Sequence, residues 1–341
     1  MTAGPRIPER NKQPGLCYAV TAGGVELPVI DVTHPAFAVA VTQPELDAIT
    51  ARTLEGFERG RWWPSFVLRL MARRSIVMRD VLAASGSYLP GMATYLQKLG
   101  PDNVGAGWGG PLDRKLLRTI GPVCMRLRLR DLAALLAADL VERLGDDPAR
   151  PLHLLNIGGG TAIDSINGLI VAERRKPGIL GGRRVVIHVL DPDHEGPAFG
   201  GRALAALGAD AGPLAGLNVT LERHDYDWAD PSRLAAIASA FGPGTPAVAC
   251  CSEGGLFEYG SDAHIVGNLS ALRGLTPADC IVTGTVLCDG RVGRAMVKYG
   301  RVALRLRDAS SFAALVESAG WRVARAIDEG NVYHVVSLVK A

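Results

Sequence analysis

Three consecutive glycines, Gly158-Gly159-Gly160, stand where a short apolar run gives way to a segment with helical periodicity. Glycine lets a backbone approach a ligand closely, and the free N–H groups of a first helical turn favour an anionic or polar ligand. The next apolar run, RVVIHVLD, ends in Asp191, whose carboxylate can accept hydrogen bonds from both hydroxyls of a ribose. Together these features indicate a nucleotide-type site, with a simple tight turn between strand and helix as the alternative.

Two further apolar runs end in polar or aromatic residues. The run NVTLERHD leads into Asp225-Tyr226, which offer an acid for the amino group of adenine and an aromatic face for its ring. The run PAVACCSE ends in Ser252-Glu253, directly before two glycines. If these runs are parallel strands, their carboxyl ends meet at one edge of the sheet, and four strand ends direct polar groups at one crevice.

The glycine turn departs from the dinucleotide fingerprint, because Ile163 stands where the third glycine would be. Less room for a pyrophosphate favours a nucleoside without phosphates. An NAD(P)-dependent oxidoreductase with a Rossmann domain is the alternative in another enzyme class. The missing glycine, the predicted hairpin at the end of the chain and the lack of a Tyr-x-x-x-Lys pair count against it.

The second half of the sequence predicts the sheet that positions these groups. Five short apolar runs at 152–157, 184–191, 218–225, 246–253 and 279–287 are separated by stretches with helical character. Such alternation predicts a parallel sheet covered on both faces. A helix over 310–321 precedes two runs joined by only three residues, which is too short for a parallel crossover. We therefore expect an α/β fold with seven strands, mostly parallel, and an antiparallel last strand.

The first half is predicted to be mainly helical, with helices beginning near Pro44 and Pro64 and another over 123–144. We place a boundary near 150, between a helical region over 1–150 and a second domain over 151–341. The first region has 19 basic and 15 acidic residues, and the second has 18 and 19. The surplus of positive charge is therefore confined to the helical region.

Composition excludes several classes of protein. The 341 residues are 48% hydrophobic and 21% charged, which is typical of a folded globule of about two domains. A net charge of +3 gives no indication of nucleic-acid binding, and no apolar run is long enough to cross a membrane. The start shows no secretory signal, so we expect a cytoplasmic protein. Its six cysteines lack metal-binding spacing, so we expect reduced buried thiols and no metal site.

The order Asn156-Ile-Gly-Gly-Gly-Thr-Ala162, Asp191, Asp225-Tyr226 and Ser252-Glu253, followed by a helix and a hairpin, resembles the class I S-adenosylmethionine (SAM)-dependent methyltransferases over about 150–341. The resemblance implies a Rossmann-like, SAM-binding domain. In that family the glycine turn lies against the methionine portion and ribose, the acid after the second strand binds the ribose, and the pair after the third contacts adenine. The cofactor-binding residues carried over are Asn156, Gly158, Gly159, Gly160, Asp191, Pro192, Asp225, Tyr226, Ser252 and Glu253.

Two positions depart from the family pattern. The family usually has an acid where Asn156 stands, and often a glycine where Ala162 stands. A methyltransferase-like protein that binds SAM without turnover therefore remains an alternative. The segment over 252–259 is also similar to the EGLLMYL-type segment of leucine carboxyl methyltransferase-like enzymes, many of which O-methylate small molecules. This likeness implies a small-molecule acceptor, with oxygen slightly preferred over carbon or nitrogen as the methylated atom.

Methyl transfer needs a base only if the acceptor carries a proton of high pKa. Candidate catalytic residues follow the fourth predicted strand, namely Glu253, Tyr259 and His264, with Glu258 as a further candidate there. Asp289 is a candidate after the fifth predicted strand. The alternative for His264 is an exposed place in the first turn of a helix. His153 and His188 fall inside strand runs and are predicted to be core residues.

The helical region contains a basic and aromatic stretch. One interpretation is a lid that recognises an anionic or aromatic acceptor, and the other is a solvated helix face. In small-molecule methyltransferases a helical addition of this kind covers the substrate or forms a homodimer. The residues of the stretch are Arg59, Arg61, Trp62, Trp63, Phe66, Arg69, Arg73, Arg74 and Arg79.

Overall fold

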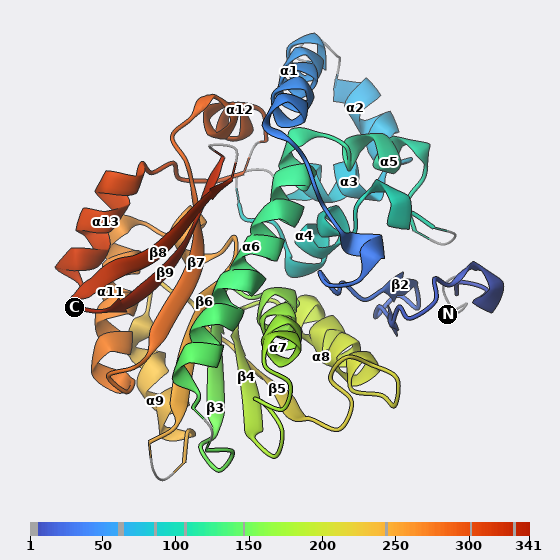
Figure 1. Ribbon diagram of the computed structural model, residues 1–341. Helices are drawn as coiled ribbons and strands as arrows, with labels where there is room; N and C mark the ends of the chain where they lie inside the picture. Colours follow the sequence, from blue (N-terminus) through green and yellow to red (C-terminus); the bar gives the residue numbers. More distant parts are fainter. Residues whose placement is uncertain are drawn as a thin grey trace.

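A seven-stranded sheet in the order β5-β4-β3-β6-β7-β9-β8 forms the centre of the computed structural model (Figure 1). The structure describes residues 6–60, 65–84, 87–105, 108–145, 147–242, 245–300, 302–329 and 332–341. β3 to β7 pair in parallel, and β9 runs antiparallel to both β7 and β8. The predicted Rossmann-like sheet is thus confirmed. Its strands are β3 (Leu152–Ile157), β4 (Arg184–Leu190), β5 (Asn218–His224), β6 (Ala247–Ser252), β7 (Ile281–Leu287), β8 (Trp321–Glu329) and β9 (Tyr333–Lys340).

The strand order reverses between β3 and β6. From β3 the chain continues outward through β4 to β5, and it then returns to place β6 and β7 on the other side of β3. Helices that follow β3 and β6 therefore leave the sheet on opposite faces, and a crevice opens at the carboxyl ends of these two strands. The central strands β3, β6 and β7 are buried along their whole length, whereas the edge strand β5 is partly exposed.

Helices cover both faces of the sheet (Figure 1). One face packs against α6 (Ile120–Arg143), α7 (Ile163–Arg175) and α8 (Glu195–Leu207), and the other against α9 (Leu234–Ser239), α11 (Asp262–Leu275) and α13 (Ala309–Ser318). Two short helices, α10 (Leu256–Tyr259) and α12 (Arg291–Gly300), follow β6 and β7. α6 precedes residue 150 and yet packs on α7, β7 and β9, so the first half of the chain supplies part of one helical layer.

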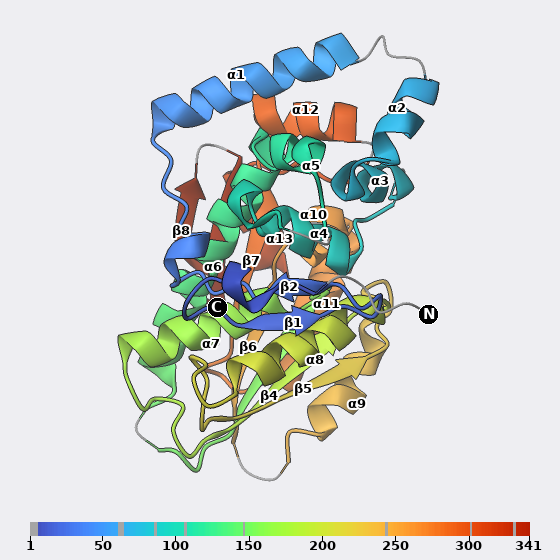
Figure 2. The same cartoon turned by 90° about the vertical axis from the view of Figure 1, so that its right-hand side faces the viewer.

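The first half is mainly helical, as predicted. Its helices are α1 (Gln43–Gly60), α2 (Ser65–Ala72), α3 (Ile76–Ala83), α4 (Gly91–Lys98) and α5 (Pro111–Leu116), in addition to α6. A small hairpin of β1 (Tyr18–Val20) and β2 (Glu26–Pro28) was not predicted, because three-residue strands leave too short a pattern. Figure 2 shows this hairpin lying along α8, with α1 crossing the far end of the molecule.

Five of the six cysteines are buried, as the sequence predicts, and Cys17 is half-buried. Within the described residues, no helix is long and apolar enough to span a membrane.

Candidate functional site

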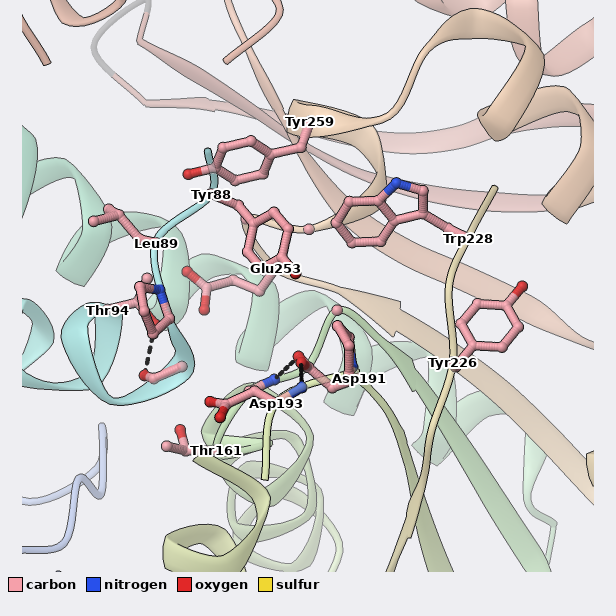
Figure 3. A pocket seen from close by; sticks show the side chains of 18 of the residues that line it. Tyr88, Leu89, Thr94, Thr161, Asp191, Asp193, Tyr226, Trp228, Glu253 and Tyr259 are labelled. Atoms are coloured by element: carbon pink, nitrogen blue, oxygen red, sulfur yellow. Dashed lines mark hydrogen bonds between the residues drawn. The ribbon is translucent and has the colours of Figure 1, made fainter. Parts of the chain in front are cut away.

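A pocket of about 220 Å³ lies at the carboxyl ends of the parallel strands, where the strand order reverses (Figure 3). One side, which we call the strand-end wall, consists of residues 158–161, 191–193, 226–228 and 253–255. The opposite side, which we call the cover, is formed by residues 88–98, where 88–91, 94 and 98 face the pocket, and α10 adds Tyr259. The pocket therefore combines strand ends of the second half with a helical segment of the first.

The glycine turn is shaped for close approach. Gly158 and Gly160 have φ of +65° and +50°, in the left-handed region that favours glycine. A Cβ on Gly158 would lie 2.9 Å from the ring of Trp228, and one on Gly160 would lie 2.7 Å from the Cα of Gly91. A larger side chain at Gly158 would thus clash with Trp228 of the same wall, and one at Gly160 would clash with the cover. Ala162, the N-cap of α7, also has a positive φ of 54°.

Asp191 lies directly beside this turn. One carboxylate oxygen accepts a hydrogen bond from the backbone N–H of Gly160 at 2.8 Å, and the other accepts from the N–H of Asp193 at 2.8 Å (Figure 3). A carboxylate can accept about four hydrogen bonds, so acceptor capacity remains for a ligand. Burial raises the pKa of Asp191, while the two backbone N–H groups oppose that shift. Asp191 thus lines the pocket, and its role as a ribose ligand stays a prediction.

Aromatic rings form the upper part of the pocket. The Tyr88 ring meets the rings of Trp228 and Tyr259 edge-on, with centroids 6.1 and 6.3 Å apart (Figure 3). Tyr226 also lines the pocket, and its hydroxyl donates to Asn268 Oδ1 at 2.5 Å. Burial raises the pKa of the Tyr259 hydroxyl to about 12, so that this group stays protonated at neutral pH. The aromatic side can therefore contact a flat ligand and donate one hydrogen bond.

A buried group of charges joins the cover to the strand-end wall. Glu253 forms ion pairs with Lys98 of α4 and with Arg128 Nε of α6, the latter at 2.6 Å. Arg128 Nη1 also contacts both carboxylate oxygens of Glu258 at 2.9 Å, and Thr285 donates to one of them. Burial alone would raise the pKa of Glu253, but the charges of Lys98 and Arg128 outweigh it and lower that pKa. Glu253 is thus an ionised, fully paired group and a weak base.

Eight of the predicted site residues line the pocket together: Gly158, Gly159, Gly160, Asp191, Pro192, Tyr226, Glu253 and Tyr259. Four others do not line it. The sequence did not predict Tyr88, Gly91, Thr94 and Lys98, because α4 and the residues just before it carry no motif and lie far from the strands in the chain. The only signal for them was the expectation that the helical region covers the site.

The four residues outside the pocket have other partners. Asn156 is buried and donates to Asp164 and Ser165 at 2.7 and 2.8 Å, which fixes the start of α7. Ser252 donates to the carbonyl of Ile157 and accepts from the N–H of Leu256, so it links β3 to α10. These two side chains therefore position the strand-end wall from behind.

Asp225 and His264 point elsewhere. Asp225 is exposed and lies 3.6 Å from both Arg223 and Arg233. His264 belongs to the capping box of α11, where its Nδ1 accepts from the N–H of Ser261 and its own N–H donates to the Ser261 hydroxyl. This geometry corresponds to the alternative for His264, a place in the first turn of a helix.

The basic stretch does not line the pocket within the described residues. Arg59 pairs with Glu55 on α1, and Arg73, Arg74 and Arg79 are exposed, which agrees with a solvated helix face. The predicted lid residues Arg61, Trp62 and Trp63, and the side chain of Arg69, lie outside the described residues. Two further base candidates are paired: Asp289 with Arg294 at 2.8 Å, and Glu258 with Arg128.

No protein-family model matches the chain, and no curated protein matches it. Among solved structures, a possible exported protein from Bordetella parapertussis is 18% identical over 90% of this chain and 99% of that one, with a TM-score of 0.53. LepI in complex with SAM is 16% identical over 59% of this chain, with a TM-score of 0.39, and the match spans 46% of LepI. The mitomycin 7-O-methyltransferase MmcR is 16% identical over 68% of this chain and 58% of that one, with a TM-score of 0.40.

At these identities the likeness concerns the fold. The Bordetella match extends over almost the full length of both chains, so it includes the helical first half as well as the sheet. The sheet order and the antiparallel β9 are the Rossmann-like arrangement that the resemblance to class I methyltransferases implied.

Proposed function

We propose that the protein is a SAM-dependent methyltransferase that acts on a small molecule. The observation that carries this proposal is the meeting of the glycine turn, Asp191 and an aromatic side in one pocket, at the place where the strand order reverses. Charge supports it as well, because Asp191, Asp193, Asp227 and Glu253 line the pocket and Lys98 is the one cationic side chain among the lining residues that the structure describes. An acidic pocket favours a ligand with net positive charge, such as SAM.

The residues of the strand-end wall fit SAM. Asp191 has acceptor capacity for the ribose hydroxyls, and the glycine turn lines the pocket without a side chain that would fill it. Trp228 offers an aromatic face for the adenine ring. When bound, SAM would supply a methyl group on a positively charged sulfur. The residues of the pocket would hold that group, exclude water and orient the acceptor, and positioning of this kind supplies much of the acceleration.

For the acceptor we propose a flat aromatic molecule with a hydroxyl group, held between the cover and Tyr259. The rings of Tyr88 and Tyr259 support an aromatic acceptor, whereas the acidic lining gives no support for an anionic one. The protonated Tyr259 hydroxyl is suited to donate a hydrogen bond to the acceptor oxygen. We expect Tyr259→Phe to raise the KM for the acceptor with a modest effect on kcat, whereas a kcat loss above about a hundredfold would assign a proton-transfer role instead.

Two measurements test this function. In a thermal-shift assay, SAM and S-adenosylhomocysteine should raise the Tm and NAD(P)H should not. Stabilisation by NAD(P)H alone would overturn the proposal and favour the oxidoreductase alternative. Formation of S-adenosylhomocysteine with a panel of aromatic hydroxy compounds then tests turnover, and binding without turnover would favour the non-catalytic alternative.

We also propose that the protein acts as a cytoplasmic homodimer. Phe66 and Leu70 of α2 are exposed apolar side chains, 68% and 50% accessible, and they support an interface through the helical first half. Light scattering after size exclusion tests this point, and a monomeric mass would contradict it.

A further inference from the structure

Three histidines form a chain across neighbouring strands, away from the pocket lining. His153 of β3, His188 of β4 and His224 of β5 project from the same face of the sheet, and each is displaced two residues from the next in register. His153 Nδ1 lies 2.9 Å from His188 Nε2, and His188 Nδ1 lies 3.0 Å from His224 Nε2. The ring of Phe241 packs on His153 and His188, with centroids 4.6 and 5.8 Å away, and shields them from water.

A carboxylate completes this group. Glu222 lies two residues before His224, so the two side chains share one face of β5. Its Oε2 is 3.7 Å from His188 Nδ1, and one ligand atom from each of His188, Glu222 and His224 lies within 4.8 Å of the others. His188 is buried, His224 is half-buried and the Glu222 side chain is 47% exposed. The cluster is therefore anchored inside and open to solvent at the edge of the sheet.

The two ring nitrogens that would bind the metal ion share one hydrogen bond. His188 Nδ1 and His224 Nε2 lie 3.0 Å apart, so one of them carries the proton between them. When both nitrogens bind a metal ion, that proton moves to the other nitrogen of the same ring, and each ligand atom then presents a lone pair.

We propose that His188 Nδ1, His224 Nε2 and the Glu222 carboxylate bind one divalent transition-metal ion, with zinc as the best match. Zinc prefers four ligands at about 2.0–2.2 Å, which places neighbouring ligand atoms about 3.3 Å apart. The observed separations of 3.0 and 3.7 Å from His188 Nδ1 bracket that value. The exposed Glu222 side chain can move inward to complete the set, and water takes the fourth position.

His153 would support this site without touching the metal. When Nδ1 of His188 binds the ion, its Nε2 carries the proton and donates to His153 Nδ1, which fixes the orientation of the ring. The site would also stabilise the edge of the sheet beside the pocket, since the carbonyl of His224 accepts from the N–H of Asp191 at 3.1 Å. Linear sequence hides this cluster, because His188 and Glu222 belong to strands separated by a whole helix.

Titration of the metal-free protein with zinc, in competition with a coloured chelator, tests the proposal. The variants are Glu222→Gln and His224→Asn. The control is His334→Asn, which removes a histidine on β9, several strands away from β4 and β5 in the sheet. We expect one zinc ion per wild-type chain, affinity lower by about tenfold or more in both variants, and no change in the control. Cobalt should give the visible spectrum of a tetrahedral site in the wild type and in the control, and it should not give that spectrum in either variant of the site.

A thermal-shift measurement gives an independent readout. Zinc should raise the Tm of the wild-type protein over that in chelator, and it should not raise the Tm of Glu222→Gln, whose altered side chain is exposed enough for the fold to tolerate the change. No zinc uptake by the wild type, or equal uptake by the wild type and both variants, would overturn the proposal. Neither result depends on SAM, so the outcome leaves the proposed function to its own test.

Discussion

The two sides of the pocket are built in different ways. The strand-end wall consists of short turns that directly follow buried strands, and its key groups are backbone atoms and Asp191. The cover comes from a helical segment much earlier in the chain and is held by the buried ion pair between Lys98 and Glu253. Local sequence therefore specifies the strand-end wall, whereas an ion pair between residues far apart in the chain fixes the cover. Substitutions should therefore separate stability from cofactor binding.

The largest expected effect is on the buried charges behind the cover. Arg128→Met leaves Glu253 without one of its cations and Glu258 without its ion pair, both in the interior. We expect a loss of about 3–5 kcal/mol in the free energy of unfolding, measured by urea denaturation. Arg73→Met, at an exposed arginine, is the matched control and should change stability little. Equal stability of Arg128→Met and the wild type would show that this buried group of charges does not stabilise the fold.

The next effect concerns the strand-end wall alone. Asp191→Ala should weaken SAM binding by about 1.5–3 kcal/mol, the range for hydrogen bonds to a charged group, as measured by isothermal titration calorimetry. Asp225→Ala is the control, because the sequence predicts this residue as a ligand and the structure places it outside the pocket, paired with Arg223 and Arg233. If Asp225→Ala lost as much affinity as Asp191→Ala, the assignment of the two acids would be wrong.

The strand-end wall was largely predictable because each of its parts follows an apolar run. Gly158, Gly160 and Asp191 were placed correctly by that rule alone. The rule locates a residue at a strand end but leaves the direction of its side chain open, which is why Asn156 and Ser252, predicted as ligands, face inward. Lys98 was not predictable in this way, since its partner Glu253 lies far away in the sequence.

Two buried acids beside the pocket should contribute to the stability of the folded state with opposite dependences on pH. Asp164, against Asn156, has its pKa raised from 3.8 to about 6 by burial. The protonated acid favours the folded state, so its contribution is present below pH 3.8 and is lost as the pH rises through about 6. Asp164→Asn should remove that dependence. As the pH rises from 4 to 7, the free energy of unfolding of this variant should increase relative to that of the wild type by on the order of 2 kcal/mol. A constant difference between the two proteins across this range would contradict the buried, protonatable state of Asp164.

The contribution of Glu253 to stability depends on pH in the opposite direction. Its pKa is lowered by Lys98 and Arg128 after the opposing effect of burial, so its contribution to stability is present above the unfolded pKa and is lost as the pH falls through the folded one. The wild type should therefore lose the attachment of the cover in acid.

The smallest effect is expected for His264. His264→Ala removes one hydrogen bond of the α11 capping box and should cost about 1 kcal/mol of stability, measured by thermal unfolding. Methyl transfer should keep its wild-type kcat, because the side chain does not line the pocket. A kcat loss of more than about tenfold at equal folded fraction would restore the catalytic role that the sequence predicted for this residue.

The central claim is that SAM binds between the two sides of the pocket. Hydrogen–deuterium exchange of the full chain, with and without saturating SAM, tests it most directly. We predict that the amides of residues 158–161 and of residues 91–98 exchange more slowly when SAM is present. Unchanged exchange in both segments would contradict the account.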